Sequence, residues 1–357
     1  MALVNVTSLQ RAAEKYQKDM ILLPYALLIP TLRELKISML EVDNRDIVIV
    51  RNRRGGLAKP YDLGGNNATL EEEISRMQER ALDTEFAFCS IKDNIKNYKE
   101  KRVLFDASKD KLNNQTKKHP LEQEIISDQV ITVGEDIIDS VFHSTRDAED
   151  KTPMGMCDGI FTHMDNLAVA GAISEAKGNL VAIPANGLNA PVDETDTKAY
   201  DTLVVWLRNV DPKWRNKAMA LYMTTEVLFN VKDALQNKKR GIRDVTFNDV
   251  LTALREDCRL PNLQIVSHYA LGTGDRLVLT TPGNFDLGMN TFSDAGFVQV
   301  RNPWEDPNFV QFWMQWQMGT RIKNLHKRGF MMSDGSVVSN ELSGDYTLTD
   351  SGVAVGI

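Results

Sequence analysis

The stretch Pro120–Ser144 has the most regular pattern of apolar residues in the chain. These residues are spaced by four, three, four and four positions, at Ile126, Val130, Val133, Ile137 and Val141. This is the spacing of one face of an α-helix, and a proline at the start suits the first helical turn. The pattern predicts one helix over the whole stretch, the longest in the chain. We expect two regions of the protein to be built around it.

Composition limits the class of protein. A chain of 357 residues with 42% hydrophobic and 25% charged residues can bury the core of one large domain or of two ordinary ones. The net charge of −7 argues against a protein that reads nucleic-acid sequence, because such proteins usually carry a basic face. Cys89, Cys157 and Cys258 lack metal-ligand spacing, which predicts reduced thiols in a cytosolic setting. The N-terminus lacks the pattern of a signal peptide, and the apolar run at 20–29 is too short to span a membrane.

The sequence carries no strong catalytic motif. It contains no GxxxxGK[ST], no G-x-S-x-G and no H-E-x-x-H. His163 and Asp165 together with Asp158 could be drawn as metal ligands, but polar residues on a surface loop explain them better. We therefore expect a protein that is not an enzyme and that holds no cofactor and no metal.

Residues 1–45 read as an arm. Two prolines within MILLPYALLIP favour an extended segment over a helix. Such a segment cannot bury its own side chains, so it should lie on the body of the protein or on a neighbouring subunit. The candidate interface residues of the arm are Leu22, Leu23, Tyr25, Leu27 and Leu28.

A hairpin is expected after the arm. Residues 46–50 (DIVIV) have the composition of a strand, a basic and glycine-rich loop follows, and the return strand falls near 70–80. The basic residues of the loop are Arg51, Arg53, Arg54 and Lys59. They either face solvent or pair with acidic groups of another subunit. Alternation over 82–90 then predicts a further strand.

From 179 to 290 the pattern alternates between strands and helices, which predicts a compact α/β module. Helices are expected at 196–209, at 225–237 and behind a capping box formed by Thr246 and Asp249. Farther on, FVQFWMQWQM at 309–318 also fits a helix, but its alternation of apolar residues and glutamines favours a long strand. Residues 333–357 are rich in Gly, Ser and Thr and read as a tail.

The order of these elements resembles the major capsid protein of tailed bacteriophages, with the Hong Kong 97-like shell fold that encapsulins share. The resemblance covers about residues 20–332. It is sharpest in ERALDTEFAFCSIKDNIKNY, in LPNLQIVSHYALGTGDRLVLTTPGNFDLGMN and in VQVRNPWEDPNFVQFWMQWQMGTRIKNLHKRGFM. These stretches look like the strand that enters the peripheral domain, the axial-domain strands and the closing peripheral strands.

The resemblance implies an α+β fold with five parts. Residues 1–45 would form the N-terminal arm and 46–80 the extended loop over the neighbouring subunit. Residues 81–178 and 291–332 would form the peripheral domain with its long spine helix, residues 179–290 the α/β axial domain, and residues 333–357 the C-terminal tail.

The resemblance also implies a function and partners. The chain would assemble with itself into hexamers and pentamers of an icosahedral head, formed in the bacterial cytoplasm, around double-stranded DNA that it contacts weakly and without sequence specificity. A separate scaffolding protein and a portal would be partners, a decoration protein could be a further one, and no membrane would be contacted. Lys59 lies on the loop that carries an isopeptide cross-link in some members, without an assignable partner here. The alternatives are an encapsulin-type nanocompartment shell and, from another class, a soluble α/β enzyme.

Overall fold

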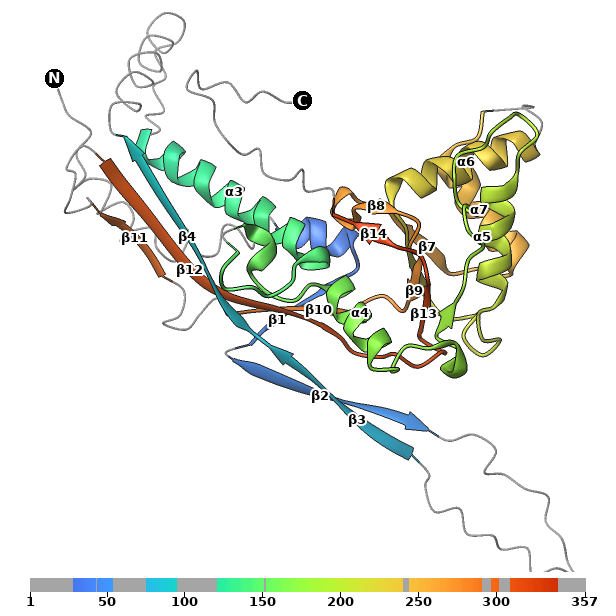
Figure 1. The fold of residues 1–357 in the computed structure, drawn as a ribbon, viewed down its shortest axis with the longest axis horizontal. Helices are drawn as coiled ribbons and strands as arrows, with labels where there is room; N and C mark the ends of the chain where they lie inside the picture. The colour runs from blue at the N-terminus through green and yellow to red at the C-terminus, as the bar shows by residue number, and fades with distance from the viewer. Residues whose placement is uncertain are drawn as a thin grey trace, which may run out of the picture.

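The structure is a computed structural model of the chain. It describes residues 28–42, 44–53, 75–94, 121–150, 152–239, 244–290, 297–301 and 309–339. Two five-stranded sheets, a projecting two-stranded hairpin and five α-helices make up most of these residues, together with a helical segment at 28–34, short 3₁₀ turns and one further strand pair (Figure 1).

The first sheet is built around one long strand, β12 (Phe309–Ile322). β4 (Glu85–Asn94) pairs antiparallel with it along one edge. On the other edge lie β11 (Phe297–Arg301) and β10 (Phe285–Asn290), and β1 (Ser38–Glu41) runs parallel to β10. The long strand predicted over 309–318 is therefore confirmed. Met314, Trp316 and Met318 lie on its buried face as the alternation requires.

The long helix predicted over 120–144 is also confirmed, as α3 (Leu121–His143). Its residues Val133, Ile137 and Val141 are buried in the same core as Met314 and Trp316 of the first sheet. A 3₁₀ turn (η1, Pro153–Gly155) and α4 (Ile160–Val169) follow, and both contact α3. The helix is stable because its apolar face packs against this sheet.

The second sheet has the order β5-β13-β9-β6-β7. Its strands are β5 (Leu180–Val181), β6 (Met219–Tyr222), β7 (Leu263–Val266), β9 (Val278–Thr280) and β13 (Phe330–Ser333). A 3₁₀ turn, η2 (Glu175–Lys177), precedes it, and another, η3 (Tyr269–Leu271), follows β7. The helices beside it are α5 (Lys198–Arg208), α6 (Thr225–Lys238) and α7 (Phe247–Cys258). The predicted capping box is present, because Thr246 and Asp249 bond each other's backbone N–H groups.

The second sheet separates two hydrophobic cores, one on each of its faces. Met219 and Leu221 of β6 pack with α5, α6 and α7, whereas Ala220 and Tyr222 pack with the core of α3 and the first sheet. All four side chains are at most 2% exposed. A strand buried on both faces reads as a continuous apolar run, which is why MALY shows no alternation.

Several predicted boundaries differ from the structure. The extended run predicted at 20–30 is wrong at its end, because residues 28–34 are helical and Pro30 is part of that helical segment. Proline is tolerated in a first helical turn, where its missing N–H removes no bond. The strand predicted over 82–90 is two strands, which meet at Thr84.

Two strands each pair in a different sheet from the one that their position in the chain predicted. β10, expected in the axial module, pairs with β12 and β1 in the first sheet. β13, expected in the closing peripheral part, pairs with β9 and β5 in the second. The predicted tail also begins inside the fold, because β14 (Val337–Val338) pairs with β8 (Thr273–Gly274). Residues 340–357 lie outside the described part.

Candidate assembly surfaces

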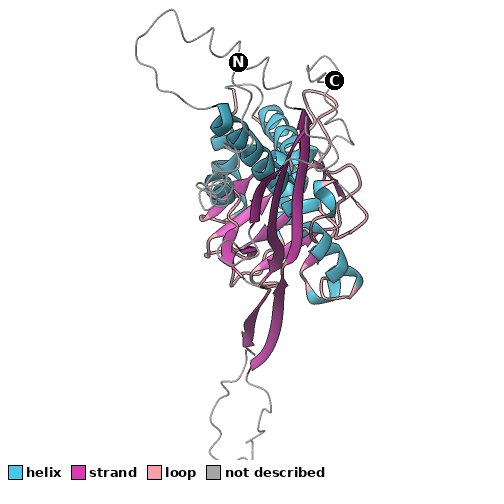
Figure 2. Cartoon of the chain, turned by 90° about the vertical axis from the view of Figure 1, so that its left-hand side faces the viewer, coloured by secondary structure: helices cyan, strands magenta, loops and turns pink. Residues whose placement is uncertain are grey.

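The most prominent feature of the surface is a hairpin that leaves the body. β2 (Arg45–Arg53) and β3 (Ser75–Asp83) pair antiparallel from Arg45 opposite Asp83 to Arg53 opposite Ser75. They join neither five-stranded sheet and point away from both (Figures 1 and 2). Ile47 and Ile49 of β2 are 49% and 58% exposed. A two-stranded ribbon of this kind is marginal alone, so it needs a firm root or a second surface to lie on.

The root of the hairpin sits on a pair of glycines. Gly288 of β10 and Gly319 of β12 are directly opposite each other in register. A Cβ atom on Gly319 would overlap the carbonyl oxygen of Asp83, and one on Gly288 would overlap the side chain of Leu82. Leu82 is fully buried there. The two glycines allow the chain to cross the sheet closely where β3 passes into β4.

A buried guanidinium ties both strands of the hairpin to the same sheet. Arg321 of β12 is opposite Asp286 of β10 and pairs with it at 2.8 Å. It pairs with Asp46 of β2 at 3.0 Å and donates to the backbone carbonyls of Asp46 and Arg80 at 3.2 and 3.3 Å. The Arg321 side chain is 1% exposed and that of Asp286 is fully buried.

Lys323 completes this group, with its Nζ 2.7 Å from the second oxygen of Asp286. The buried carboxylate is thus shared by two cations, and one of these cations also reaches the hairpin. The arrangement fixes the direction of the hairpin relative to the sheet, because each hairpin strand offers Arg321 a carbonyl oxygen.

The solvent-facing side of β4 carries aromatic residues. Phe86 and Phe88 are 52% and 64% exposed, whereas Ala87 between them is buried. Phe88 stacks on Trp313 of β12, with ring centroids 5.2 Å apart. The aromatic face of this strand therefore points away from the core. Exposed aromatic rings on a sheet are typical of surfaces that another chain covers.

A titratable contact joins α3 to η3. Asp139 of α3 accepts a hydrogen bond from Tyr269, and burial together with the nearby Glu135 raises the pKa of Asp139 to about 6. The folded protein thus holds the Asp139 proton more tightly than the unfolded chain does. This group makes folding less favourable as pH rises from about 4 to about 6.

We expect the Asp139→Asn variant to be more stable than the wild type at pH 7.5, because the amide keeps the bond to Tyr269 without a desolvated charge. The difference in melting temperature should shrink as pH falls towards 4.5, where the wild-type carboxyl is protonated. Thermal unfolding followed by circular dichroism at several pH values measures both. An equal difference at every pH would contradict the prediction. Asp233→Asn on α6 serves as a control.

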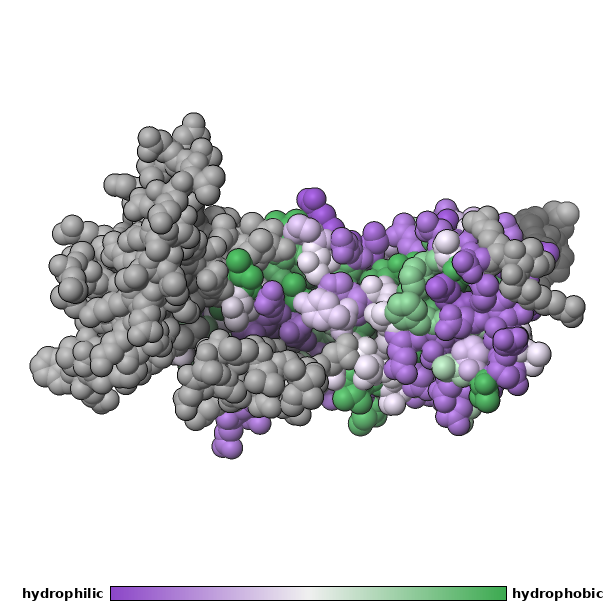
Figure 3. All heavy atoms as spheres, turned by 90° about the horizontal axis from the view of Figure 1, so that it is seen from above, coloured by the Kyte–Doolittle hydropathy of each residue, from purple (hydrophilic) through white to green (hydrophobic). Residues whose placement is uncertain are grey.

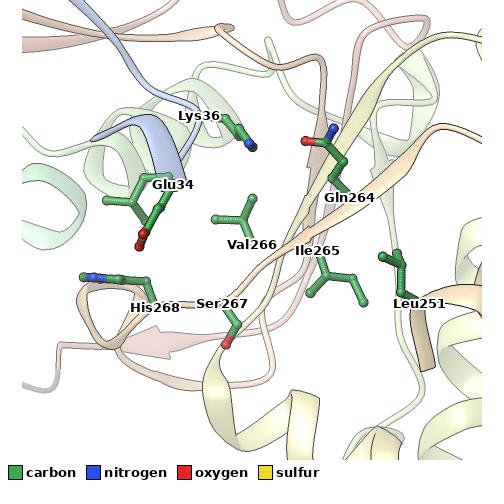
Figure 4. A pocket seen from close by; sticks show the side chains of 9 residues that line it. Glu34, Lys36, Leu251, Gln264, Ile265, Val266, Ser267 and His268 are labelled. Atoms are coloured by element: carbon green, nitrogen blue, oxygen red, sulfur yellow. The ribbon is translucent and has the colours of Figure 1, made fainter. Parts of the chain in front are cut away.

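A pocket of about 380 Å³ lies beside β7 (Figure 4). Glu34 lines it from the end of the helical segment 28–34 and Lys36 from the turn that follows, while Gln264, Ser267 and His268 line it from β7 and the residues after it. β7 is the last strand of the second sheet, so its outer edge has no partner strand among the described residues. The adjoining Leu263 carbonyl is capped by Arg255 at 2.7 Å, which shortens the free edge.

The surface seen in Figure 3 is mostly hydrophilic, with separate apolar spots. Within the described ranges, no three His, Cys, Asp or Glu residues are close enough to hold a metal. Asp158 accepts from the Arg146 backbone N–H and Asp165 pairs with Arg276, so both carboxylates that the sequence offered as metal ligands have partners within the protein. The three cysteines are free thiols, and no helix of the described part is long and apolar enough to cross a membrane.

The predicted interface residues lie in three kinds of place: in a strand, in the core, and outside the described part of the chain. Arg51 and Arg53 lie in β2 and not in a loop, because the strand pairing continues to Arg53. Leu28 is fully buried in the core of its own chain, so its side chain is not on a surface open to a partner. The other candidates lie outside the described residues: Leu22, Leu23, Tyr25, Leu27, Arg54 and Lys59. Phe86, Phe88 and the glycine pair were missed, since only the pairing of strands reveals them.

Comparison with known proteins identifies the fold. No protein-family model and no curated protein sequence matches this chain. Among solved structures, the capsid of Myoviridae phage XM1 is similar with a TM-score of 0.51 and 9% identity, over 85% of this chain and 91% of that one. A chain of the satellite phage P4 procapsid, which includes the size determination protein, has a TM-score of 0.49 and 12% identity, over 87% and 98% of the two chains.

The capsid of the empty GTA particle has a TM-score of 0.48 and 14% identity, over 85% and 94% of the two chains. The likeness to the XM1 capsid shows that this chain has the fold of a phage capsid protein. The resemblance to tailed-phage major capsid proteins, expected from the order of elements, is confirmed at this level.

Proposed function

We propose that this chain is the major shell subunit of a tailed-phage head, and that copies of it form hexamers and pentamers of an icosahedral capsid around double-stranded DNA. The fold supports a structural role and not a catalytic one. The observation that carries the proposal is the hairpin: two strands leave the body with exposed isoleucines, and a dedicated network holds their root. A single copy gains little from a ribbon in solvent, whereas a shell gains an overlap between neighbours.

The parts of the subunit follow from this proposal. The division of buried residues into two cores supports a peripheral unit, around α3 and the first sheet, and an axial unit, around α5, α6 and α7. α3 would be the spine helix and residues 46–80 the extended loop. Residues 1–45 would serve as the arm through the side chains that precede Leu28. A separate scaffolding protein, a portal and a decoration protein remain proposed partners, and the host cytoplasm the proposed place of assembly.

The direct test is to express the full chain and to examine it by negative-stain electron microscopy and sedimentation velocity, alone and with a scaffolding protein from the same gene neighbourhood. Closed shells, or rings of five and six copies, are the expected result. A monomer or dimer under every condition, with or without a scaffold, would refute the proposal. Shells that enclose a protein cargo and never DNA would point to a nanocompartment.

The exposed aromatic face gives a mutational test. We expect Phe86→Ser and Phe88→Ser together to raise the concentration needed for assembly about tenfold or more, because aromatic side chains covered at an interface contribute about 1–3 kcal/mol each. Light scattering against protein concentration measures this. The unassembled variant should lose only about 0.5–1.5 kcal/mol of stability, from the stack of Phe88 on Trp313, since both rings are more than half exposed in the single subunit. Val169→Ser, at a side chain that is 92% exposed on α4, is the control.

A further inference from the structure

A second pocket of about 290 Å³ lies at the base of the hairpin and is lined by basic side chains. Arg80 of β3, Lys177 of η2, and His326 and Lys327 of the segment between β12 and β13 contribute to it. Asn179 lines it too, but its amide is fully engaged with the backbone of Ser174, Ala172 and Leu325. None of its lining residues in the described part of the chain is acidic.

The charges of this pocket are not balanced by any residue that the structure describes. Arg80 is half-buried, and no described residue forms an ion pair or a side-chain hydrogen bond with its guanidinium. Burial accordingly lowers the pKa of Arg80. Lys177 donates to the Gly171 carbonyl at 2.6 Å and forms no ion pair with a described residue. The acidic group next to Lys327, Asp211, is paired with Arg328 at 3.5 Å.

The side chains of the pocket offer hydrogen-bond donors, which favours an anionic ligand. His326 accepts the Arg328 backbone N–H at Nδ1, so its neutral ring carries the proton on Nε2 and can donate there. Arg80, two lysines and this ring offer donors only. A half-buried cation without a partner is costly, and a carboxylate or phosphate group would relieve that cost.

We propose that this pocket, which for this purpose we call the basic pocket, binds a side-chain carboxylate of a second copy of the chain. A cavity of this size admits a side chain, whereas a duplex carries its phosphates on the outside of a wide rod that needs an exposed basic face. The chain has more acidic than basic residues, 49 against 42, so its own surface supplies the complementary charge. The inference rests on the proposed shell function.

Two exposed loops of the subunit present suitable carboxylates. In residues 147–150, Asp147 and Asp150 accept from the backbone of Glu149 and Thr152, whereas the Glu149 carboxylate has no partner among the described residues. In residues 193–196, Asp193 and Asp196 accept from the backbone of Thr195 and Lys198, whereas Glu194 has no partner in the part of the chain that the structure describes. Glu149 and Glu194 are thus exposed carboxylates that could reach another copy.

Cross-linking identifies the occupant. Particles assembled from an equal mixture of ¹⁵N-labelled and unlabelled full chains are treated with a carbodiimide, which joins a lysine amine directly to a carboxylate in contact with it. We expect peptides of mixed isotope composition in which Lys177 or Lys327 is joined to an acidic residue, and the peptide shows which one. Links from these lysines only within single copies would overturn the proposal.

Charge removal measures the effect. Arg80→Gln, and separately Lys177→Gln with Lys327→Gln, should each raise the assembly concentration about tenfold or more, as expected when one partner of a buried ion pair is lost. Lys217→Gln, an exposed lysine on the second-sheet side, removes the same charge and should change it less than twofold. Assembly of the pocket variants equal to that of Lys217→Gln would overturn the inference, while normal wild-type shells would leave the proposed function intact.

A DNA-binding measurement tests whether the pocket binds phosphate groups of DNA and not a protein carboxylate. Binding of a fluorescent 30-base-pair duplex to the unassembled chain should be the same for wild type and the pocket variants. Reduced duplex binding together with normal assembly would show a phosphate site and overturn the proposal. Unfolding of the unassembled variants in urea checks that the substitutions leave the subunit folded.

Discussion

Replacing Arg321 by methionine is expected to lower the free energy of unfolding by about 3–5 kcal/mol. The variant leaves Asp286, which is fully buried, with Lys323 as its one remaining cation among the described residues. It also removes the donors to the carbonyls of Asp46 and Arg80. Urea unfolding of the unassembled chain measures the loss. Hydrogen exchange should rise over residues 45–53 and 75–83 first, because these strands lose their tie to the sheet.

Two further variants show whether the buried charge is responsible. Arg328→Met breaks an ion pair whose arginine is 39% exposed, and we expect a loss of less than about 1 kcal/mol. Arg321→Met combined with Asp286→Leu leaves no buried carboxylate, so it should be more stable than Arg321→Met alone. If the double variant lost the sum of the free energies of unfolding that the two single variants lose, this account would be contradicted. Packing and not charge would then dominate the site.

Replacing Gly319 by alanine is expected to be the second severe change. The new methyl group would overlap a backbone atom, the Asp83 carbonyl oxygen, so the crossing from β3 to β4 must move as a whole. Overpacking of this kind costs about 1–3 kcal/mol or more. We expect a lower unfolding midpoint in urea, and loss of shells even where the subunit still folds, since the hairpin would leave the body in another direction.

Gly288 provides a matched comparison on the facing strand. An alanine there overlaps the end of the Leu82 side chain and not the backbone, so it should cost less than the same change at Gly319. Adding Leu82→Ala should relieve the overlap at Gly288 and leave the Gly319 variant unimproved. Rescue of both variants by Leu82→Ala would contradict the proposed difference, because it would place the obstruction at Gly319 on a side chain.

The functional surfaces were harder to predict than the elements that carry them. The hairpin was expected, since a strand, a glycine-rich loop and a return strand follow one another in the chain. Arg321, Asp286 and the two glycines stand in unremarkable strand sequences, and their roles exist only because β10 and β12 pair in one particular register. Alternation over 82–90 predicts a strand but does not say which face is buried; in the structure the small residues Ala87 and Cys89 face the core that also holds the apolar side of α3.

The sequence alone determined the elements that depend on local pattern. The helical spacing of apolar residues is sufficient to predict α3, and the alternation of apolar residues and glutamines is sufficient to predict β12. The capping-box pair Thr246 and Asp249 predicts the start of α7. Tertiary structure alone decided which sheet β10 and β13 join and which side chains meet at the root of the hairpin. Neighbours along the chain set local conformation through sterics and short hydrogen bonds. Strand partners, by contrast, are chosen by burial of faces from segments far apart in sequence, and no local pattern records that choice.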